Sequence, residues 1–265
     1  MRRAFAALTV VGLVGAASLA VAQGAYSPAT SGYLTPQTTP DAARILPPAP
    51  IAGSLRDEQD RAVFKATRAL EGTPRWAMAQ NDVSQAPANT MADFSCAIGA
   101  ELTASNAPRL YGLLGRMVKD ASREVNASKA VFKRKRPYLI DEGSICVPMT
   151  DDLAASPDYP SGHTTWGWSV GLILAELAPE RGTEILVRAR AYGESRVVCG
   201  VHNASAIEAG RTAGAALVAA LHGDRAFRAD LAAAREEVET AREAAGPPRP
   251  TCEAQNQLAA TTPYP

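Results

Sequence analysis

Three short stretches of the chain carry residue types that could handle a phosphate group. They are KAVFKRKRP at 129–137, PSGH at 160–163 and SRVVCGVH at 195–202. Phosphoryl transfer requires fixed positive charges or N–H donors around the phosphorus, an in-line nucleophile and a proton for the leaving group. A Ser-Gly pair that opens a helix presents free N–H groups to an anion, and a histidine beside it can transfer a proton. Together the three stretches predict a phosphate site.

Each of these residues also has an ordinary structural interpretation when it is taken alone. Ser161 could be a simple helix N-cap, Arg196 a surface ion-pair partner and His202 a polar residue near the core. Lys129 and Arg136 could be solvated charges. Their spacing of seven residues, which is two helical turns, predicts that they lie on one face of a helix. The other charged residues of this stretch are expected to stay in solvent: Lys133, Arg134 and Lys135.

In their order and spacing, the stretches resemble the phosphatidic-acid-phosphatase type 2 (PAP2) superfamily, and specifically its soluble bacterial class A nonspecific acid phosphatases. The signature of that family is Lys, six residues, Arg-Pro; then Pro-Ser-Gly-His; then Ser-Arg, five residues, His, three residues, Asp. ILPPAP at 45–50 and IEAGR at 207–211 also look like these enzymes, so the resemblance covers roughly residues 45–225. Three motifs in the right order are far more specific than any one of them.

The resemblance implies an all-α helical bundle and an acid phosphatase that hydrolyses a broad range of phosphomonoesters. By this resemblance His202 is the nucleophile and forms a phosphohistidine, while His163 protonates the leaving alcohol and then activates a water molecule. Fixed cations take the place of a metal ion, so no metal and no other cofactor is expected. The expected partners are small phosphomonoesters and inorganic phosphate. The residues that the resemblance assigns to the phosphate oxygens are Lys129, Arg136, Ser161, Gly162 and Arg196.

The chain departs from the family signature at one position. The Asp that follows the nucleophile by four residues is Ala206 here. A carboxylate at that position would hold the second ring nitrogen of His202 and fix its tautomer. Glu208 would face another way in a helix, so Asn203 or a backbone carbonyl is the candidate to orient the ring instead. Restoring an Asp at position 206 is expected to raise turnover unless another group already holds the ring.

Two other functions stay open at this point. The loss of the family Asp favours a degenerate phosphate-binding homologue with weak or no turnover. A vanadium-dependent haloperoxidase would use the same cradle to hold vanadate, but the short chain and the class A resemblance argue against it.

The first residues of the chain are typical of a secretory signal peptide. Met1-Arg2-Arg3 is basic, residues 4–20 are apolar, and Ala20-Val21-Ala22 is an A-x-A cleavage site. Cleavage after Ala22 predicts a periplasmic or secreted protein. The apolar run is short for the alternative, an uncleaved membrane anchor, and no later segment is predicted to cross a membrane.

Beyond a signal peptide at 1–22, we expect a Pro-rich N-terminal arm at 23–50, one all-α domain at 51–246 and a loose C-terminal tail at 247–265. No repeat and no strand-like alternation of useful length is present. The pattern of apolar and capping residues predicts helices that begin at Ser54 and at Thr73-Pro74, and further helices over 106–126, 161–178, 182–198, 205–222 and 225–245.

Cysteine usage and charge limit the remaining possibilities. The cysteines are Cys96, Cys146, Cys199 and Cys252. An even number in an exported protein predicts two disulfides in one of three pairings, although Cys199 could instead be a buried free thiol. Their wide spacing does not fit a zinc site. The formal net charge is +0, which gives no general attraction to nucleic acid or to an anionic membrane. The sequence leaves open whether the protein forms a homo-oligomer.

Overall fold

The structure, a computed structural model, describes residues 31–245 and 249–264. These residues form helices joined by loops and contain no β-strand, as the predicted all-α fold requires. The predicted signal peptide and the first part of the Pro-rich arm lie outside the described residues. None of the described helices is long and apolar enough to span a membrane. The α-helices are α1 (Ala42–Ile45), α2 (Leu55–Thr67), α3 (Pro74–Asn81), α4 (Pro87–Ile98), α5 (Pro108–Phe132), α6 (Asp151–Ala155), α7 (Gly162–Leu177), α8 (Gly182–Val198), α9 (Ala204–Leu221), α10 (Arg225–Glu243) and α11 (Pro250–Ala260).

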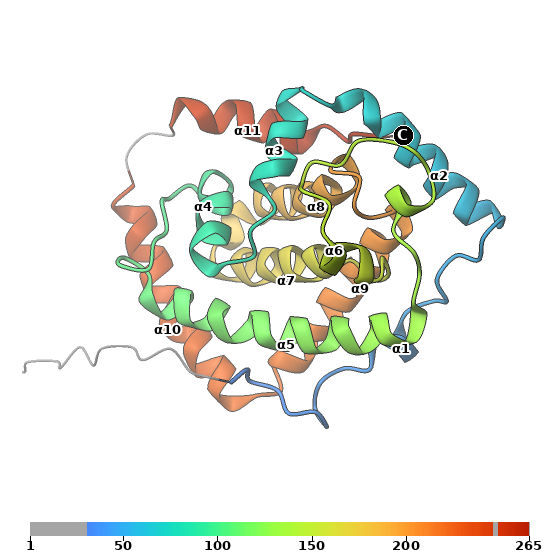
Figure 1. Cartoon of the computed structure of the whole chain (residues 1–265). Coiled ribbons are helices and arrows are strands. Elements are labelled where there is room, and N and C mark those ends of the chain that lie inside the picture. The colour runs from blue at the N-terminus through green and yellow to red at the C-terminus, as the bar shows by residue number, and fades with distance from the viewer. Residues whose placement is uncertain (1–30, 246–248, 265) are drawn as a thin grey trace, which may run out of the picture.

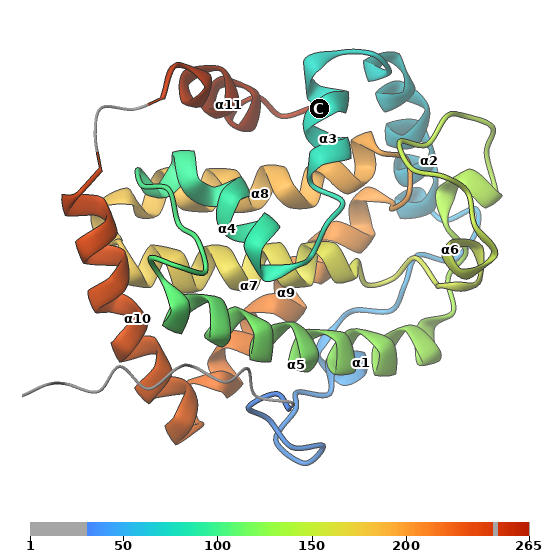
Figure 2. The same ribbon diagram turned by 60° about the vertical axis from the view of Figure 1, so that its left-hand side comes forward.

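Helix α7 is the centre of the bundle. It lies between α5 and α8 in both views (Figures 1 and 2), and it packs most extensively against α8 and α9. Trp166, Val170 and Ile173 are fully buried on it. Gly171 lets the backbone of α7 approach α8 closely, because a Cβ at this position would collide with the side chain of Ala189. The N-terminus of this buried helix is therefore held in a fixed place.

Two of the predicted helix starts are confirmed at the level of their caps. The hydroxyl of Ser54 accepts a hydrogen bond from the N–H of Asp57, and the hydroxyl of Thr73 accepts one from the N–H of Trp76. A side chain that accepts from the first turn satisfies a backbone donor that has no partner within the helix. The local sequence is sufficient to define where α2 and α3 begin.

The predicted helical face that joins Lys129 to Arg136 is wrong. Helix α5 ends at Phe132, and Lys133 follows in the left-handed conformation with φ of 50°. Arg136 then lies in extended backbone, just before a short 3₁₀ turn at Pro137–Leu139. The two cations nevertheless reach the same place, because the chain turns back at Lys133 instead of continuing as a helix.

Arg134 is buried, which contradicts its predicted place in solvent. Its guanidinium lies 3.0 Å from Asp57 Oδ1 and 2.9 Å from Asp60 Oδ2, both on α2, and 3.4 Å from Asp158 Oδ2 in the loop before α7. It also donates to the hydroxyl of Ser205 on α9 at 2.8 Å. One cation therefore neutralises three buried carboxylates and joins four parts of the chain.

The two ends of the described chain are more ordered than the sequence indicates. Tyr33 and Leu34, in the Pro-rich arm, are buried, and their N–H groups donate to the carboxylate of Asp120 on α5. Residues 250–260, expected within a loose tail, form α11. The tail is fixed because Cys252 is bonded to Cys96 on α4.

The cysteines form the two disulfides that the sequence predicts. The pairs are Cys96–Cys252 and Cys146–Cys199, so Cys199 is not a free thiol. The second disulfide ties the long loop between α5 and α6 to the loop that follows α8. Both of those loops lead to candidate site residues.

Arg134→Met is expected to lower the free energy of unfolding by about 3–5 kcal/mol, because the substitution leaves buried carboxylates without their shared cation. Lys135→Met is the matched control: its side chain is exposed, and its expected effect is within about 0.5 kcal/mol. Urea unfolding of the two variants beside the parent measures the difference. Equal stability of the two variants would contradict the assignment of Arg134 as a structural centre.

Candidate active site

A cavity of about 190 Å³ lies at the N-terminus of α7. The last turns of α5, the start of α7 and the loop between α8 and α9 each contribute residues to it. The predicted site residues that line it are Lys129, Arg136, Gly162, His163 and His202. The other two predicted residues, Ser161 and Arg196, are buried at the N-cap of α7 and in the last turn of α8. The fold thus brings residues from all three sequence stretches to one region.

The hydrogen bonds of His202 define its tautomer. Arg136 Nη1 lies 3.2 Å from Nε2 of the ring, and Asp158 Oδ1 lies 2.9 Å from Nδ1. A guanidinium can only donate and a carboxylate accepts, so the proton of the neutral ring is on Nδ1 and the lone pair is on Nε2. Nε2 is therefore the nitrogen that can attack an electrophile in the cavity.

Asp158 is a candidate functional residue that the sequence analysis missed. Its fully buried carboxylate accepts from His202 Nδ1, from the backbone N–H of Asn203 at 3.1 Å and from Asn203 Nδ2 at 2.8 Å. Burial raises the pKa of Asp158, whereas Arg134 and the two Asn203 donors oppose that rise. The only sequence signal for Asp158 was its position two residues before the PSGH motif, in a segment whose composition predicts a loop.

Position 206 has a different role from the one expected of it. Ala206 is fully buried in an apolar cluster with Tyr159 and Leu46, and its carbonyl accepts the N–H of Ser161 at 3.0 Å. Asp158 reaches His202 from another element, so a carboxylate holds the ring although position 206 has none. Asn203, expected as an alternative partner of the ring, instead binds Asp158.

His163 is held by a backbone carbonyl. Its Nε2 lies 2.8 Å from the carbonyl oxygen of Val83, in the loop between α3 and α4. Because a carbonyl oxygen can only accept, Nε2 carries a proton, and Nδ1 is the nitrogen left for chemistry in the cavity. The ordinary N-cap role of Ser161 is also present, since its hydroxyl accepts from the N–H of Thr164.

Two of the cations are oriented by a common partner. Lys129 Nζ donates to Ser156 Oγ at 3.0 Å, and Arg136 Nε donates to the Ser156 carbonyl at 2.7 Å. Burial lowers the pKa of Lys129 to about 8, and the neighbouring charge of Arg136 adds to this shift. Ser156 was not predicted, because nothing in its local sequence marks it.

Arg196 carries donors with nothing to bind among the described residues. Its Nε and Nη1 atoms are buried and have no hydrogen-bond partner there. Burial lowers its pKa to about 10, which still leaves the group charged at neutral pH. Buried donors without a partner are costly, so a site that retains them is suited to an anion that supplies the acceptors.

Both histidines are deprotonated more easily than free histidine. Burial lowers the pKa of His163 and of His202 well below the ordinary value, and in each case nearby guanidinium groups add to the effect. The cavity therefore combines fixed cations with imidazoles that lose a proton readily. Arrival of a phosphate dianion would reverse much of this shift, because it places negative charge beside both rings.

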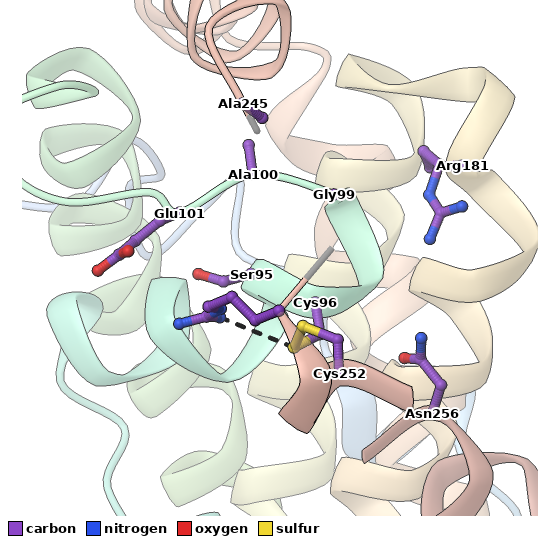
Figure 3. Close-up of a pocket in the computed structure, with 10 residues that line it drawn as sticks. Ser95, Cys96, Gly99, Ala100, Glu101, Arg181, Ala245, Cys252 and Asn256 are labelled. Carbon is purple, nitrogen blue, oxygen red and sulfur yellow. Dashed lines mark hydrogen bonds between the residues drawn. A yellow bond between two sulfur atoms is a disulfide. The ribbon is translucent and has the colours of Figure 1, made fainter. Parts of the chain in front are cut away.

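A larger cavity of about 480 Å³ lies beside the Cys96–Cys252 disulfide, lined in part by Ser95, Arg181 and Asn256 (Figure 3). Arg249 Nη2 contacts the sulfur of Cys96 at 3.7 Å in this cavity. None of the predicted site residues lines it. Its size alone gives it no chemistry, since no histidine among the described residues lines it.

Known proteins resemble this chain over most of its length. The chain is 40% identical to the acid phosphatase of Zymomonas mobilis subsp. mobilis, an alignment that covers 78% of this chain and 79% of that protein. It is 34% identical to the non-specific acid phosphatase of Providencia stuartii and 32% identical to that of Salmonella typhimurium, which it covers to 84% and 83%. The model of the PAP2 superfamily matches residues 111–229.

The chain belongs to the PAP2 superfamily. All seven predicted site residues lie inside the segment that matches this family, and so does Asp158. Asp82, which directly follows α3, lies outside that segment.

Asp158→Asn is expected to lower kcat strongly, because the amide no longer favours the His202 tautomer with its lone pair on Nε2. Loss of the corresponding carboxylate in serine proteases costs about 10⁴ in turnover, which is an upper guide here because cations carry more of a phosphate site. Steady-state turnover of a phosphomonoester measures the effect, and an unchanged kcat would contradict it.

Ala206→Asp is the matched test of the family position. Because Asp158 already accepts from Nδ1 of His202, a second carboxylate has no N–H left to bind, and the two negative charges would repel each other. We therefore expect no gain in turnover. A clear increase would show that Asp158 does not orient the ring.

Proposed function

We propose that the protein is an exported, metal-independent acid phosphatase that hydrolyses a broad range of phosphomonoesters through a phosphohistidine at His202. The observation that carries this proposal is the arrangement of His202, whose Nε2 lone pair faces Arg136 while Asp158 binds the opposite nitrogen. The acid phosphatases related to the chain support the reaction class. The basic and apolar start of the sequence supports export.

The first half-reaction forms an N–P bond and breaks the ester P–O bond. Nε2 of His202 attacks the phosphorus, and the leaving oxygen takes a proton from Nδ1 of His163. Lys129, Arg136 and Arg196 would stabilise the charge on the equatorial oxygens, together with the N-terminus of α7 at Ser161 and Gly162. The Nε and Nη1 donors of Arg196, which have no hydrogen-bond partner among the described residues, are available for this without first breaking other bonds.

The second half-reaction releases phosphate. Nδ1 of His163, now neutral, takes a proton from water, and the resulting hydroxide oxygen attacks the phosphorus. The N–P bond breaks and returns the electron pair to Nε2 of His202. Asp158 stabilises the positive charge that the ring carries while it is phosphorylated.

The position of Asp158 also weakens the main argument for the alternative function, a degenerate phosphate-binding homologue with weak or no turnover. That alternative rests on the missing Asp at 206, and another buried carboxylate occupies the corresponding role. A pure binding protein would still retain the cations, so turnover remains the property that separates the two.

The pH dependence follows from the directions of the two histidine pKa shifts. His202 must be neutral to attack, and its lowered pKa keeps it neutral well below about pH 6.5, the ordinary value. His163 must be protonated to act as an acid, and its lowered pKa restricts that form to acidic pH. Lys129, with a pKa of about 8, loses its charge as the pH rises further.

We therefore expect kcat/KM to be highest on the acid side and to fall through neutrality. The apparent pKa values of the pH profile describe the interacting pair of histidines and not either histidine alone. Measurement from about pH 4 to about pH 9 tests this. An optimum at about pH 8 or above is incompatible with the assignment of His163 as the acid.

The covalent step is tested by trapping. Rapid base quenching of the enzyme with ³²P-labelled p-nitrophenyl phosphate is expected to give a base-stable, acid-labile label on His202, and EDTA should leave turnover unchanged. His202→Asn should abolish label and turnover. His222→Asn is the control, because His222 is half-exposed and pairs with Glu176 away from the cavity. Label that persists in His202→Asn, or turnover with no label, would reject the mechanism; EDTA sensitivity would reject metal independence.

A further inference from the structure

The loop between α3 and α4 supplies the acceptor for His163. Within residues 82–85 of this loop, the Val83 carbonyl binds His163 Nε2, and the Gln85 side chain lines the catalytic cavity. Loops are usually the most mobile parts of a fold. The position of His163 therefore depends on what holds this loop in place.

A buried ion pair fixes the loop at Asp82. The carboxylate of Asp82 is fully buried and binds Arg188 of α8 through two contacts, Nη2 to Oδ1 at 2.6 Å and Nη1 to Oδ2 at 3.1 Å. It also accepts from the hydroxyl of Ser195 at 2.6 Å. Arg188 in turn donates through Nε to the Asp93 carbonyl on α4 at 3.0 Å, so the pair joins the loop to both α8 and α4.

A second contact holds the loop two residues further on. The hydroxyl of Tyr192 donates to the Ser84 carbonyl at 3.2 Å. Arg188, Tyr192 and Ser195 lie four and three residues apart, so they share one face of α8. This face contacts the loop on both sides of Val83, and Ser195 directly precedes Arg196.

A buried ion pair is a weak source of stability, because removing two charges from water offsets much of their attraction. What such a pair provides is a defined geometry, since each oxygen and nitrogen must find its partner. Here the defined geometry lies one residue before the carbonyl that orients a proposed catalytic ring.

We propose that Asp82, Arg188 and Tyr192 form an anchor that positions His163 for proton transfer by holding the Val83 carbonyl on Nε2. The anchor residues are positioning residues and do not touch the substrate. This inference rests on the proposed function, because it assumes that His163 is the acid. In this arrangement the transferred proton is the one on Nδ1 of His163, and the proton on Nε2 stays bonded to the Val83 carbonyl.

The anchor should matter most for substrates whose leaving group needs a proton. p-Nitrophenolate leaves readily without one, whereas an alkoxide such as that of glycerol does not. General acid catalysis contributes about 10²–10⁴ where it is needed. The ratio of kcat/KM for glycerol phosphate to kcat/KM for p-nitrophenyl phosphate therefore reports the acid itself, and a general loss of folded protein does not change it.

Asp82→Asn is expected to lower this ratio about tenfold, with a smaller loss on p-nitrophenyl phosphate. The matched control is Asp230→Asn, which removes a carboxylate that pairs with Arg116 at 3.3 Å on the α5–α10 side of the bundle. Its ratio should equal that of the parent. An Asp82→Asn variant that loses both activities equally would overturn the proposal, because only a structural role would then remain.

Tyr192→Phe provides the test if Asp82→Asn does not fold, since it removes one hydroxyl and keeps the ring in place. Its ratio should fall about threefold, and an unchanged ratio would overturn the proposal. Tyr33→Phe is its control, because that hydroxyl donates to Asp230 at 2.7 Å. His163→Ala separates the two hypotheses. An unchanged ratio in His163→Ala rejects the acid role itself, whereas a fall there without a fall in the anchor variants rejects the anchor alone.

Discussion

The carboxylate of Asp158 joins the charged framework of the fold to the histidine that faces the cavity. On one side it binds His202 and Asn203, and on the other it shares Arg134 with two carboxylates of α2. A carboxylate buried this deeply is stable only with such partners, because isolated burial of its charge is prohibitively costly. The tautomer of His202 is thus tied to the packing of α2, α9 and the loop before α7.

The cavity itself has the opposite balance of charge. Lys129, Arg136 and Arg196 are all buried, and burial lowers the pKa of each. Their mutual repulsion is relieved only in part by Asp158, and two donors of Arg196 have no partner among the described residues. An anion would suit this arrangement, because it supplies both acceptors and negative charge. Burying these cations with few acceptors costs stability, and the proposed phosphatase mechanism would use the same cations to hold the phosphate oxygens.

Most of the helices could be predicted from the sequence because their signals are local. Ser54, Thr73 and the apolar run of α7 each act within a few residues of themselves. The site was predicted only through motif order, and the reasoning for Lys129 and Arg136 was wrong, since a left-handed turn at Lys133 and not a continuous helix brings them together. Asp158 and Arg134 could not be found in this way, because their partners lie up to 77 residues away in sequence.

Position 206 shows that the orientation of the His202 ring need not depend on one position of the motif. What His202 requires is an acceptor for Nδ1–H at hydrogen-bond distance, and that requirement does not specify the element from which the acceptor comes. Asp158 approaches from the loop before α7 and remains buried because Arg134 and Asn203 also bind it. His163 meets the same kind of requirement with the backbone carbonyl of Val83. In both histidines the scaffold binds one ring nitrogen, and the other nitrogen is the one that the proposed mechanism uses; on His202 this is Nε2, which carries the lone pair and faces Arg136.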